Sequence, residues 1–214
     1  MRHLLLDLDH TLYPPDNGLL AEIHRRMERF VVGELRVSPE EAARLRDLFR
    51  DRHGTTMRGL MLDHGVEPNR FLSAIHDGLP GDFLSPDPAL QSVLESYAGP
   101  IHVFSNAPGD YVRRALDRLG IASRVDRVFD IEFSLYDGKP QASAYERVER
   151  ELQAAPSDLL FIDDSQENVR AALARGWRAA WVSHGKAASD LPTLESPTAM
   201  GAFLQALARE RGAA

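Results

Sequence analysis

Four short runs of apolar residues are each followed closely by acidic or small polar residues. They cover residues 3–9, 100–104, 158–163 and 178–183, and the first reads HLLLDLD. Continuous apolar runs of this length are typical of strands that are buried on both faces of a parallel sheet. A weaker run, RVFDIEF at 127–133, indicates a fifth strand. Such a sheet needs helices on both faces.

Helical spacing of apolar residues separates these runs. The recurring positions are Leu90, Val93, Leu94 and Tyr97 in one segment, and Val112, Ala115, Leu116 and Leu119 in the next. Gly120 is well placed to end the second helix. Strands that alternate with helices predict βαβ units, and hence an α/β fold with a Rossmann-like, doubly wound parallel sheet.

The segment from residue 14 to residue 81 has no convincing strand. Its Ser38-Pro39-Glu40-Glu41 stretch has the residues of a helix start, and apolar residues at helical spacing follow it. We therefore predict a helical cap domain at 14–81, inserted into a catalytic core made of residues 1–13 and 82–214. Inserts on a rigid sheet are often lids over a site.

Charge and composition exclude several classes of partner. The formal net charge of −7 argues against binding to a nucleic acid polymer or to an anionic membrane. The chain has no cysteine, which excludes disulfides and thiolate metal sites. The first apolar run contains acids and lacks a cleavage site, so we expect a cytoplasmic protein without a signal peptide. The sequence carries no pattern from which we assign an oligomeric state.

The acids at the strand ends predict a metal site. Ligands bind beyond the carboxyl ends of the strands of such a sheet, where Asp7 and Asp9 would meet Asp164. An extended backbone would point Asp7 and Asp9 the same way, and their charges would repel unless a cation lay between them. A cluster of oxygen ligands suits Mg²⁺.

Ser105 and Lys139 follow other elements that lead to the same edge and could hold phosphate oxygens. Each feature also has a simpler explanation. Ser105-Asn106 and Asp164-Ser165 could cap the helices that follow them, and Lys139 could be a solvated lysine in a loop. Asp7 and Asp9 alone could be solvated acids in a turn.

Together these residues resemble the haloacid dehalogenase superfamily, in its phosphohydrolase branch. The first motif of that family, D-x-D-x-T, is matched by Asp7, Asp9 and Thr11. A strand-terminal Ser, a Lys and an acidic pair follow in the family's order; here they are Ser105, Lys139 and Asp163-Asp164.

The resemblance implies a role for each residue. Asp7 is the nucleophile that forms an aspartyl-phosphate, and Asp9 is the general acid and then the general base. Mg²⁺ is bound by Asp7, by the backbone carbonyl of Asp9 and by Asp164. Ser105, Asn106 and Lys139 bind the phosphoryl group. Asp163, Asn168 and Thr11 contact these residues and hold them in position, and Asn168 orients a metal-bound water.

Five stretches resemble the pyrimidine 5′-nucleotidase group of this superfamily more closely. They are LDLDHTLYP, GTTMRGL, FSNA, GKPQASAYE and FIDDSQENV. The resemblance implies that the cap segment from Gly54 to Leu60 faces the substrate, with Thr55, Thr56 and Arg58 as ligands. His10 stands where the group commonly has Asn, and Gln141 where it commonly has Pro.

We therefore predict an Mg²⁺-dependent phosphatase whose substrate is a pyrimidine nucleoside 5′-monophosphate. A phosphatase for a small phosphorylated sugar or cofactor is the first alternative. A dehalogenase proper would need no acid at Asp9, because halide leaves unprotonated. A phospho-aspartate switch or a non-catalytic binding module is the alternative of another class, and a stable phosphate on Asp7 would identify the switch.

Overall fold

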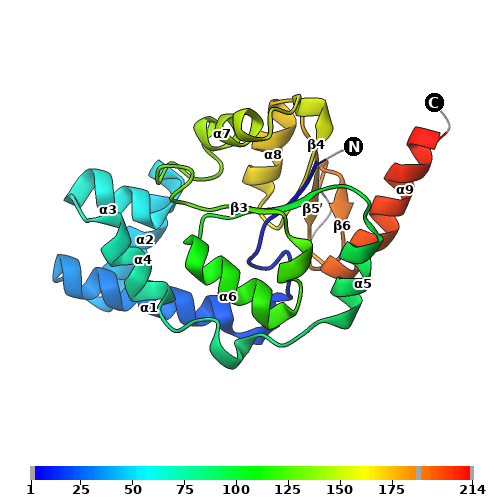
Figure 1. The fold of residues 1–214 in the computed structure, drawn as a ribbon. Helices are drawn as coiled ribbons and strands as arrows, with labels where there is room; N and C mark the ends of the chain where they lie inside the picture. Colours follow the sequence, from blue (N-terminus) through cyan, green and yellow to red (C-terminus); the bar gives the residue numbers. More distant parts are fainter. Residues whose placement is uncertain (1–2, 187–188, 213–214) are drawn as a thin grey trace.

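The computed structural model of the chain describes residues 3–186 and 189–212. Within them, a central parallel sheet has six strands in the order β3-β2-β1-β4-β5-β6 (Figure 1). The strands are β1 (His3–Leu6), β2 (Ile101–Phe104), β3 (Arg127–Phe129), β4 (Leu159–Asp163), β5 (Arg178–Val182) and β6 (Thr193–Leu194). This order is that of a doubly wound sheet and confirms the predicted fold class.

Helices precede or follow most strands of the sheet. Those between β1 and β2 are α1 (Leu19–Leu35), α2 (Pro39–His53), α3 (Thr56–His64), α4 (Pro68–His76) and α5 (Pro88–Ser96). The later ones are α6 (Gly109–Leu119), α7 (Ala142–Leu152), α8 (Gln166–Ala174) and α9 (Met200–Gly212). None of the helices in the described part of the chain is long and apolar enough to cross a membrane.

The two faces of the sheet lie in two separate hydrophobic clusters. Leu4 and Leu6 belong to the first cluster, which includes residues of α5 and α6. Leu5 belongs to the second, which includes residues of α7 and α8. Because successive side chains of a strand point to opposite faces, the run Leu4–Leu6 contributes side chains to both clusters. Figure 1 shows α7 and α8 on one side of the sheet and α6 on the other.

Two strands end three or more residues before the predicted position. The first was expected over 3–9 but ends at Leu6, and residues 8–12 form a turn in which the amides of Thr11 and Leu12 donate to the carbonyl of Leu8. The argument that an extended backbone aligns Asp7 with Asp9 is therefore wrong. The strand expected over 127–133 ends at Phe129, because the Asp130 carboxylate accepts the amide of Phe133 and starts a turn.

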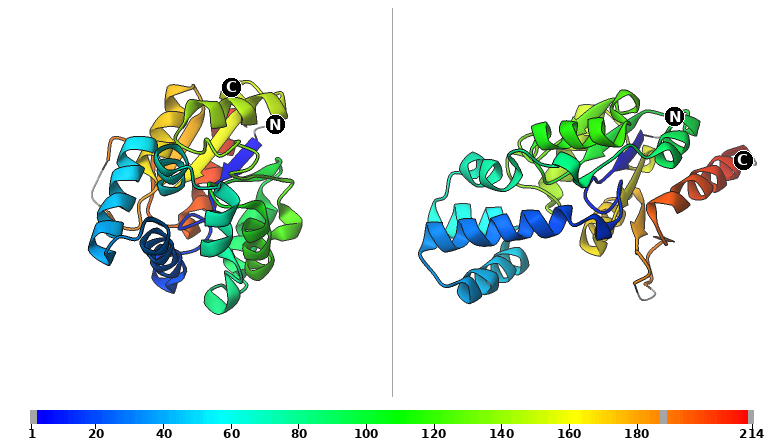
Figure 2. Two further views of the ribbon diagram at one scale, coloured as in Figure 1. Left: turned by 90° about the vertical axis from the view of Figure 1, so that its left-hand side faces the viewer. Right: turned by 90° about the horizontal axis from the view of Figure 1, so that it is seen from below.

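The helices α1 to α4 form a group of their own, here called the cap (Figure 2). Ser38 is the predicted N-cap of α2, and its hydroxyl accepts the Glu41 amide at 3.3 Å. Helices α2 and α3 approach closely because Gly59 has no side chain: a Cβ there would lie 2.3 Å from the Phe49 ring. The division of the chain at residues 13 and 82 stays a prediction.

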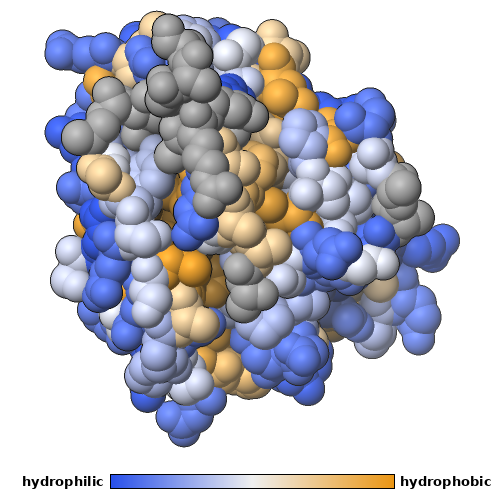
Figure 3. Space-filling model, turned by 90° about the vertical axis from the view of Figure 1, so that its right-hand side faces the viewer, coloured by the Kyte–Doolittle hydropathy of each residue, from blue (hydrophilic) through white to orange (hydrophobic). Residues whose placement is uncertain are grey.

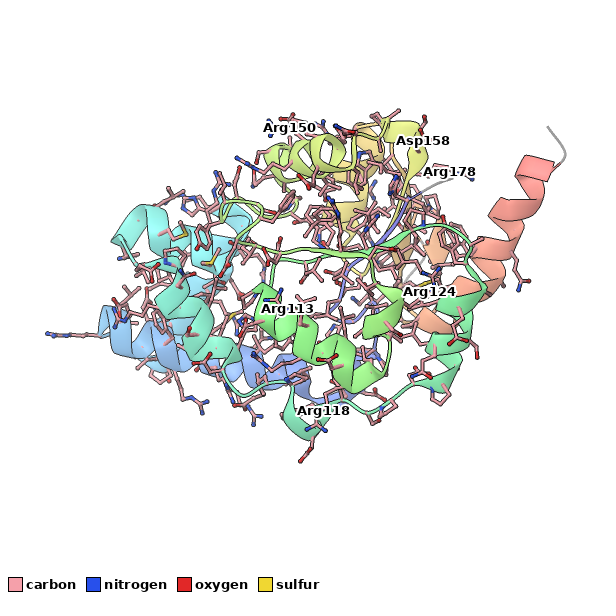
Figure 4. All side chains as sticks on the ribbon, in the orientation of Figure 1. Arg113, Arg118, Arg124, Arg150, Asp158 and Arg178 are labelled. Atoms are coloured by element: carbon pink, nitrogen blue, oxygen red, sulfur yellow. The ribbon has the colours of Figure 1, made fainter. Side chains whose placement is uncertain are left out.

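The side of the molecule away from the cap is built by α5, β6 and α9. Figure 3 shows a band of apolar surface between polar flanks on this side. Buried Met200 and Leu204 of α9 join Leu94 of α5 in the first cluster. Arg124, labelled in Figure 4, ends α5 by donating to the carbonyls of Leu94 at 3.0 Å and Gly99 at 3.2 Å.

A pair of histidines lies near the amino ends of β1 and β2. His3 Nδ1 and His102 Nε2 are 3.0 Å apart, and the rings stack at 5.3 Å. Burial, and secondly the neighbouring His3, lowers the pKa of His102 from 6.5 to about 4. Folding therefore favours the neutral ring, and the unfolded chain binds more protons between these two values.

We predict that stability falls as the pH drops below 6.5, in part through this pair. The His102 contribution lost between pH 7 and pH 5 is about 1–2 kcal/mol. Urea unfolding of the native chain and of His102→Val at several pH values measures it, since other acid-sensitive groups are common to both. The variant should lose less stability over this interval, and equal losses would contradict the assignment.

Candidate active site

The carboxyl ends of β1, β2 and β4 bring the site residues together. Leu6 of β1 pairs with Ile162 of β4, so the next residues, Asp7 and Asp163, lie side by side at the edge of the sheet. The Asp7 amide donates to the Ile162 carbonyl at 2.9 Å and continues the ladder. On the other side of β1, β2 ends just before Ser105. This edge is where doubly wound sheets bind ligands.

The side chain of Lys139 lies between Asp7 and Asp163 and donates hydrogen bonds to both. Its Nζ donates to Asp7 Oδ1 and to Asp163 Oδ2, both at 2.7 Å, and to the Phe104 carbonyl at 2.6 Å. The lysine side chain is 1% exposed, and its Nζ lies 5.1 Å from the centroid of the Phe104 ring. A buried ammonium needs such partners, because an isolated charge in an apolar interior is very costly.

Electrostatics at this edge favour an additional cation. Burial raises the pKa of Asp7, Lys139 opposes that rise, and the charges of Asp163 and Asp164 add to it. Burial alone would lower the pKa of Lys139, but the two carboxylates outweigh it and hold that pKa above its ordinary value. One lysine therefore does not neutralise three acids. A divalent cation beside Asp7 would favour the ionised form of that carboxyl group.

Asp163 is held on both of its oxygens. Oδ1 accepts the Ser165 amide at 2.7 Å and Oδ2 accepts Lys139, while the side-chain amide of Asn168 donates to both at 3.1 and 3.0 Å. Oxygens of Asp7, Asp163 and Asp164 lie within 4.8 Å of one another. Of these three, Asp7 and Asp164 also line a cavity, and this all-oxygen set fits Mg²⁺.

The loop that carries Lys139 is fixed by Asn106. The amide oxygen of Asn106 accepts the Lys139 N–H and its amide nitrogen donates to the Lys139 carbonyl, each at 2.8 Å. Gly138 makes room for this contact, because a Cβ there would lie 2.3 Å from Asn106 Oδ1. Ser105 is buried, and its hydroxyl accepts the Ala107 amide at 3.1 Å, which leaves its proton for a ligand.

Asp9 lies in the turn that follows β1. His10 adopts a left-handed backbone with φ of 61°, a conformation in which histidine is enriched among non-glycine residues. The Asp9 Oδ1 atom accepts the Tyr111 hydroxyl at 2.8 Å and also the hydroxyl of Tyr13. Burial, and then the charge of Asp9, raises the pKa of both phenols, so they remain donors.

A cavity of about 240 Å³ opens above these residues. Its floor holds seven residues predicted for the site, namely Asp7, Asp9, Ser105, Asn106, Lys139, Asp164 and Asn168. Its roof comes from the cap and is mainly apolar, with Leu20, Ile23 and Met27 of α1, Met57 of α3, and Phe71, Leu72 and Ile75 of α4. Thr55, Thr56 and His76 are the polar residues that the cap adds to this lining.

Residues 1–176 match the family model of haloacid dehalogenase-like hydrolases. The chain belongs to this family. A curated relative, phosphate metabolism protein 8 of Saccharomyces cerevisiae, is 28% identical over 193 residues, which cover 79% of this chain and 58% of that protein. The chain thus spans less than two thirds of the length of that relative.

Solved structures of other members of the hydrolase family share the fold. L-2-haloacid dehalogenase of Xanthobacter autotrophicus matches with a TM-score of 0.61 and 17% identity, over 96% of this chain and 98% of that one. A HAD phosphatase of Thermococcus onnurineus also has a TM-score of 0.61, with 16% identity over 95% and 98% of the two chains. The same fold therefore serves proteins described as dehalogenases and as phosphatases, so the site must decide the chemistry.

Three cap residues were predicted to bind substrate in this hydrolase, and the structure shows each of them bonded to another part of the protein. The Thr55 hydroxyl caps α3 by accepting the Arg58 amide at 3.1 Å, and the Thr56 hydroxyl donates to the Arg46 carbonyl at 3.3 Å. Arg58 forms an ion pair with Asp137 of the core and is absent from the cavity lining. Thr11 is fully buried, and its hydroxyl has no hydrogen-bond partner among the described residues.

Three site residues were missed in the sequence. Tyr13 and Tyr111 hold Asp9, and His76 is a buried cavity residue. Tyr13 lies inside the LDLDHTLYP stretch, four residues after Asp9, which was the available signal. Tyr111 comes from α6, 102 residues away from Asp9, and no spacing in the sequence connects the two.

We predict that the Lys139→Met variant of this hydrolase is less stable by about 3–5 kcal/mol, because two buried carboxylates lose their cation. Adding Asp163→Asn should restore part of that loss, since it removes one of the unpaired charges. Urea unfolding in EDTA measures the free energy of unfolding of the native chain, of Lys139→Met and of the double variant. Asp163→Asn alone completes the double-mutant cycle. Losses that simply add would show that Lys139 and Asp163 do not depend on each other.

Proposed function

We propose that the protein is an Mg²⁺-dependent hydrolase of phosphate monoesters that works through an aspartyl-phosphate on Asp7. The observation that carries the proposal is that Asp7 and Asp9 line one cavity with Lys139, Ser105 and Asp164. A nucleophile, a proton donor and groups that bind an anion are what phosphoryl transfer requires.

The first step would use Asp7 and Asp9. The Asp7 oxygen that is free of Lys139 attacks phosphorus, and the bond from phosphorus to the ester oxygen breaks. The electron pair goes to that oxygen, which takes a proton from Asp9 and leaves as an alcohol. Lys139 keeps Asp7 in place and, with the Ser105 hydroxyl, compensates charge near the transferring group.

The second step would return the enzyme to its starting state. Asp9, now a carboxylate, takes a proton from water, and the water oxygen attacks phosphorus. The bond between phosphorus and Asp7 breaks, and inorganic phosphate leaves. When bound beside Asp7, the Asp9 carbonyl and Asp164, Mg²⁺ would supply positive charge for the phosphoryl oxygens. Asn168, held against Asp163, would orient a water there.

Asp9 favours phosphate esters over carbon–halogen bonds. Halide leaves without a proton, whereas an alkoxide is a poor leaving group unless an acid protonates it. Asp9 is also the group expected to hydrolyse a phosphate on Asp7, which favours turnover over a long-lived switch. The position of Asp9 in the cavity lining, with two hydroxyl groups bonded to it, supports a working acid and base.

The cap residues that line the cavity favour one class of leaving group over another. Methionine, phenylalanine and isoleucine side chains supply apolar contact for a flat base, and Thr55 and His76 add hydrogen-bonding groups. A sugar phosphate would leave most of its hydroxyls unpaired against such a roof, which costs binding energy. This supports a pyrimidine nucleoside 5′-monophosphate such as UMP or CMP as the substrate. Thr55 and His76 would bind its base, and Arg58 would stay paired with Asp137 and take no part in binding.

We predict that the chain releases phosphate from UMP or CMP only with Mg²⁺ present. EDTA and, separately, Asp7→Asn should each lower the rate by at least about 10³-fold, because the nucleophile or its compensating charge is lost. Phosphate release from a panel of nucleotides and sugar phosphates measures both activity and selectivity. A preference for sugar phosphates would overturn the substrate class, and activity in Asp7→Asn would overturn the mechanism.

We predict that Thr55→Ala raises KM for UMP by about 5–10-fold through one lost hydrogen bond. Ser38→Ala is the matched control, because both residues are helix N-caps in the cap and only Thr55 lines the cavity. Steady-state kinetics and thermal unfolding of both variants separate the effects. Equal KM values in the two variants would remove Thr55 from the substrate site.

A further inference from the structure

The Asp9 carboxylate is held on one side only. Both hydrogen bonds that it accepts within the described residues end on Oδ1, one from the Tyr13 hydroxyl and one from the Tyr111 hydroxyl at 2.8 Å. The two phenols come from different parts of the chain, since Tyr13 directly follows the turn after β1 and Tyr111 belongs to helix α6. Tyr13 is 2% exposed and Tyr111 is fully buried, so neither ring has room to move away.

This arrangement distinguishes the two oxygens of Asp9. A protonated carboxyl group has one carbonyl oxygen, which accepts hydrogen bonds, and one hydroxyl oxygen, which donates. Two phenol donors on Oδ1 occupy the lone pairs of that atom, as they would those of a carbonyl oxygen. Among the described residues no hydrogen bond to Oδ2 is found, so this is the oxygen left to serve the cavity that Asp9 lines.

Helix α6 also connects Asp9 to the cap. The ring of His76, at the end of α4, lies 4.7 Å from the ring of Tyr111. Arg114, on the same helix as Tyr111, donates to the Leu79 carbonyl at 2.7 Å and to the His76 carbonyl at 3.2 Å. The end of the cap is thus fixed to the helix that holds Asp9.

We propose that Tyr111 and Tyr13 are positioning residues that fix the proton of Asp9 on Oδ2, and that His76 of the cap supports Tyr111 in this role. The inference rests on the proposed function, since it names how its acid is aimed. In the first step, the phosphorus–oxygen bond of the ester breaks, the electron pair stays on the ester oxygen, and that oxygen takes the proton from Oδ2. Asp9 is left as a carboxylate.

A comparison of two leaving groups tests the role of the tyrosines. p-Nitrophenyl phosphate releases a stabilised phenoxide that needs little protonation, whereas 2-phenylethyl phosphate releases an alkoxide that needs an acid. Both carry one aromatic ring for the apolar roof. We measure kcat/KM, because it reports the steps up to the first phosphoryl transfer and is independent of the later hydrolysis of the aspartyl-phosphate on Asp7.

We expect Tyr111→Phe to lower kcat/KM for 2-phenylethyl phosphate by tenfold or more, and for p-nitrophenyl phosphate by less than about threefold. Tyr13→Phe should act in the same direction, and the double variant should approach the selectivity of Asp9→Asn. His76→Leu should shift the ratio of the two values less, but in the same sense.

Tyr145→Phe is the matched control. Tyr145 is a fully buried tyrosine in the second cluster, and its hydroxyl donates to the Asn168 carbonyl at 2.9 Å. Its variant loses a hydrogen bond of similar length away from Asp9, so the ratio of the two values should stay that of the native chain. Thermal unfolding checks that each variant folds.

Each outcome decides one claim. If the native chain hydrolyses both esters and Tyr111→Phe and Tyr13→Phe lower both values by the same factor, or change neither, the tyrosines do not position Asp9 and the proposed function stands. If the native chain with Mg²⁺ hydrolyses neither these esters nor any member of the panel of nucleotides and sugar phosphates, the proposed function fails, and this inference fails with it.

Discussion

The ion pairs of Lys139 with Asp7 and Asp163 are the constraint on which the rest of the site depends. They put one positive charge among carboxylates at the ends of buried strands, where an unmatched charge of either sign is costly. Only two of the 25 basic residues of the chain are lysines, and one of them is here. A compact ammonium with three donors fits between two acids and a carbonyl, whereas the planar guanidinium of arginine has a different donor geometry.

The two faces of the sheet contribute different parts of the chemistry. Lys139 lies beside Phe104 and Phe161, whose rings belong to the cluster under α7 and α8, and it acts on Asp7. Tyr111 belongs to the cluster under α5 and α6, and it acts on Asp9. Asp7 and Asp9, the proposed nucleophile and acid, are therefore held by side chains of separate hydrophobic clusters, and the turn after β1 brings them to one cavity.

The sequence predicted what depends on local patterns. Short apolar runs defined the parallel sheet, and the Ser38 cap and Gly120 marked helix ends correctly. The turn at His10 escaped prediction, because apolar alternation continues past the last ladder hydrogen bond of β1. Tyr111 escaped because its partner is distant in sequence. The pairing of Arg58 with Asp137 depends on how α3 meets a loop of the core, which no spacing encodes.

That pairing gives the loop before Lys139 a double attachment. Asp137 is held by Arg58 of the cap, and two residues later the backbone of Lys139 is held by Asn106 of the core. Tyr136 adds a hydrogen bond to Asn69 of α4 at 3.0 Å. Any outward swing of the cap must therefore pull on the same short piece of chain that carries the lysine. The attachment of the cap and the position of the buried lysine therefore depend on one short loop, and because the Arg58 and Asp137 atoms that pair are themselves buried, dissolved salt would screen this attachment only weakly.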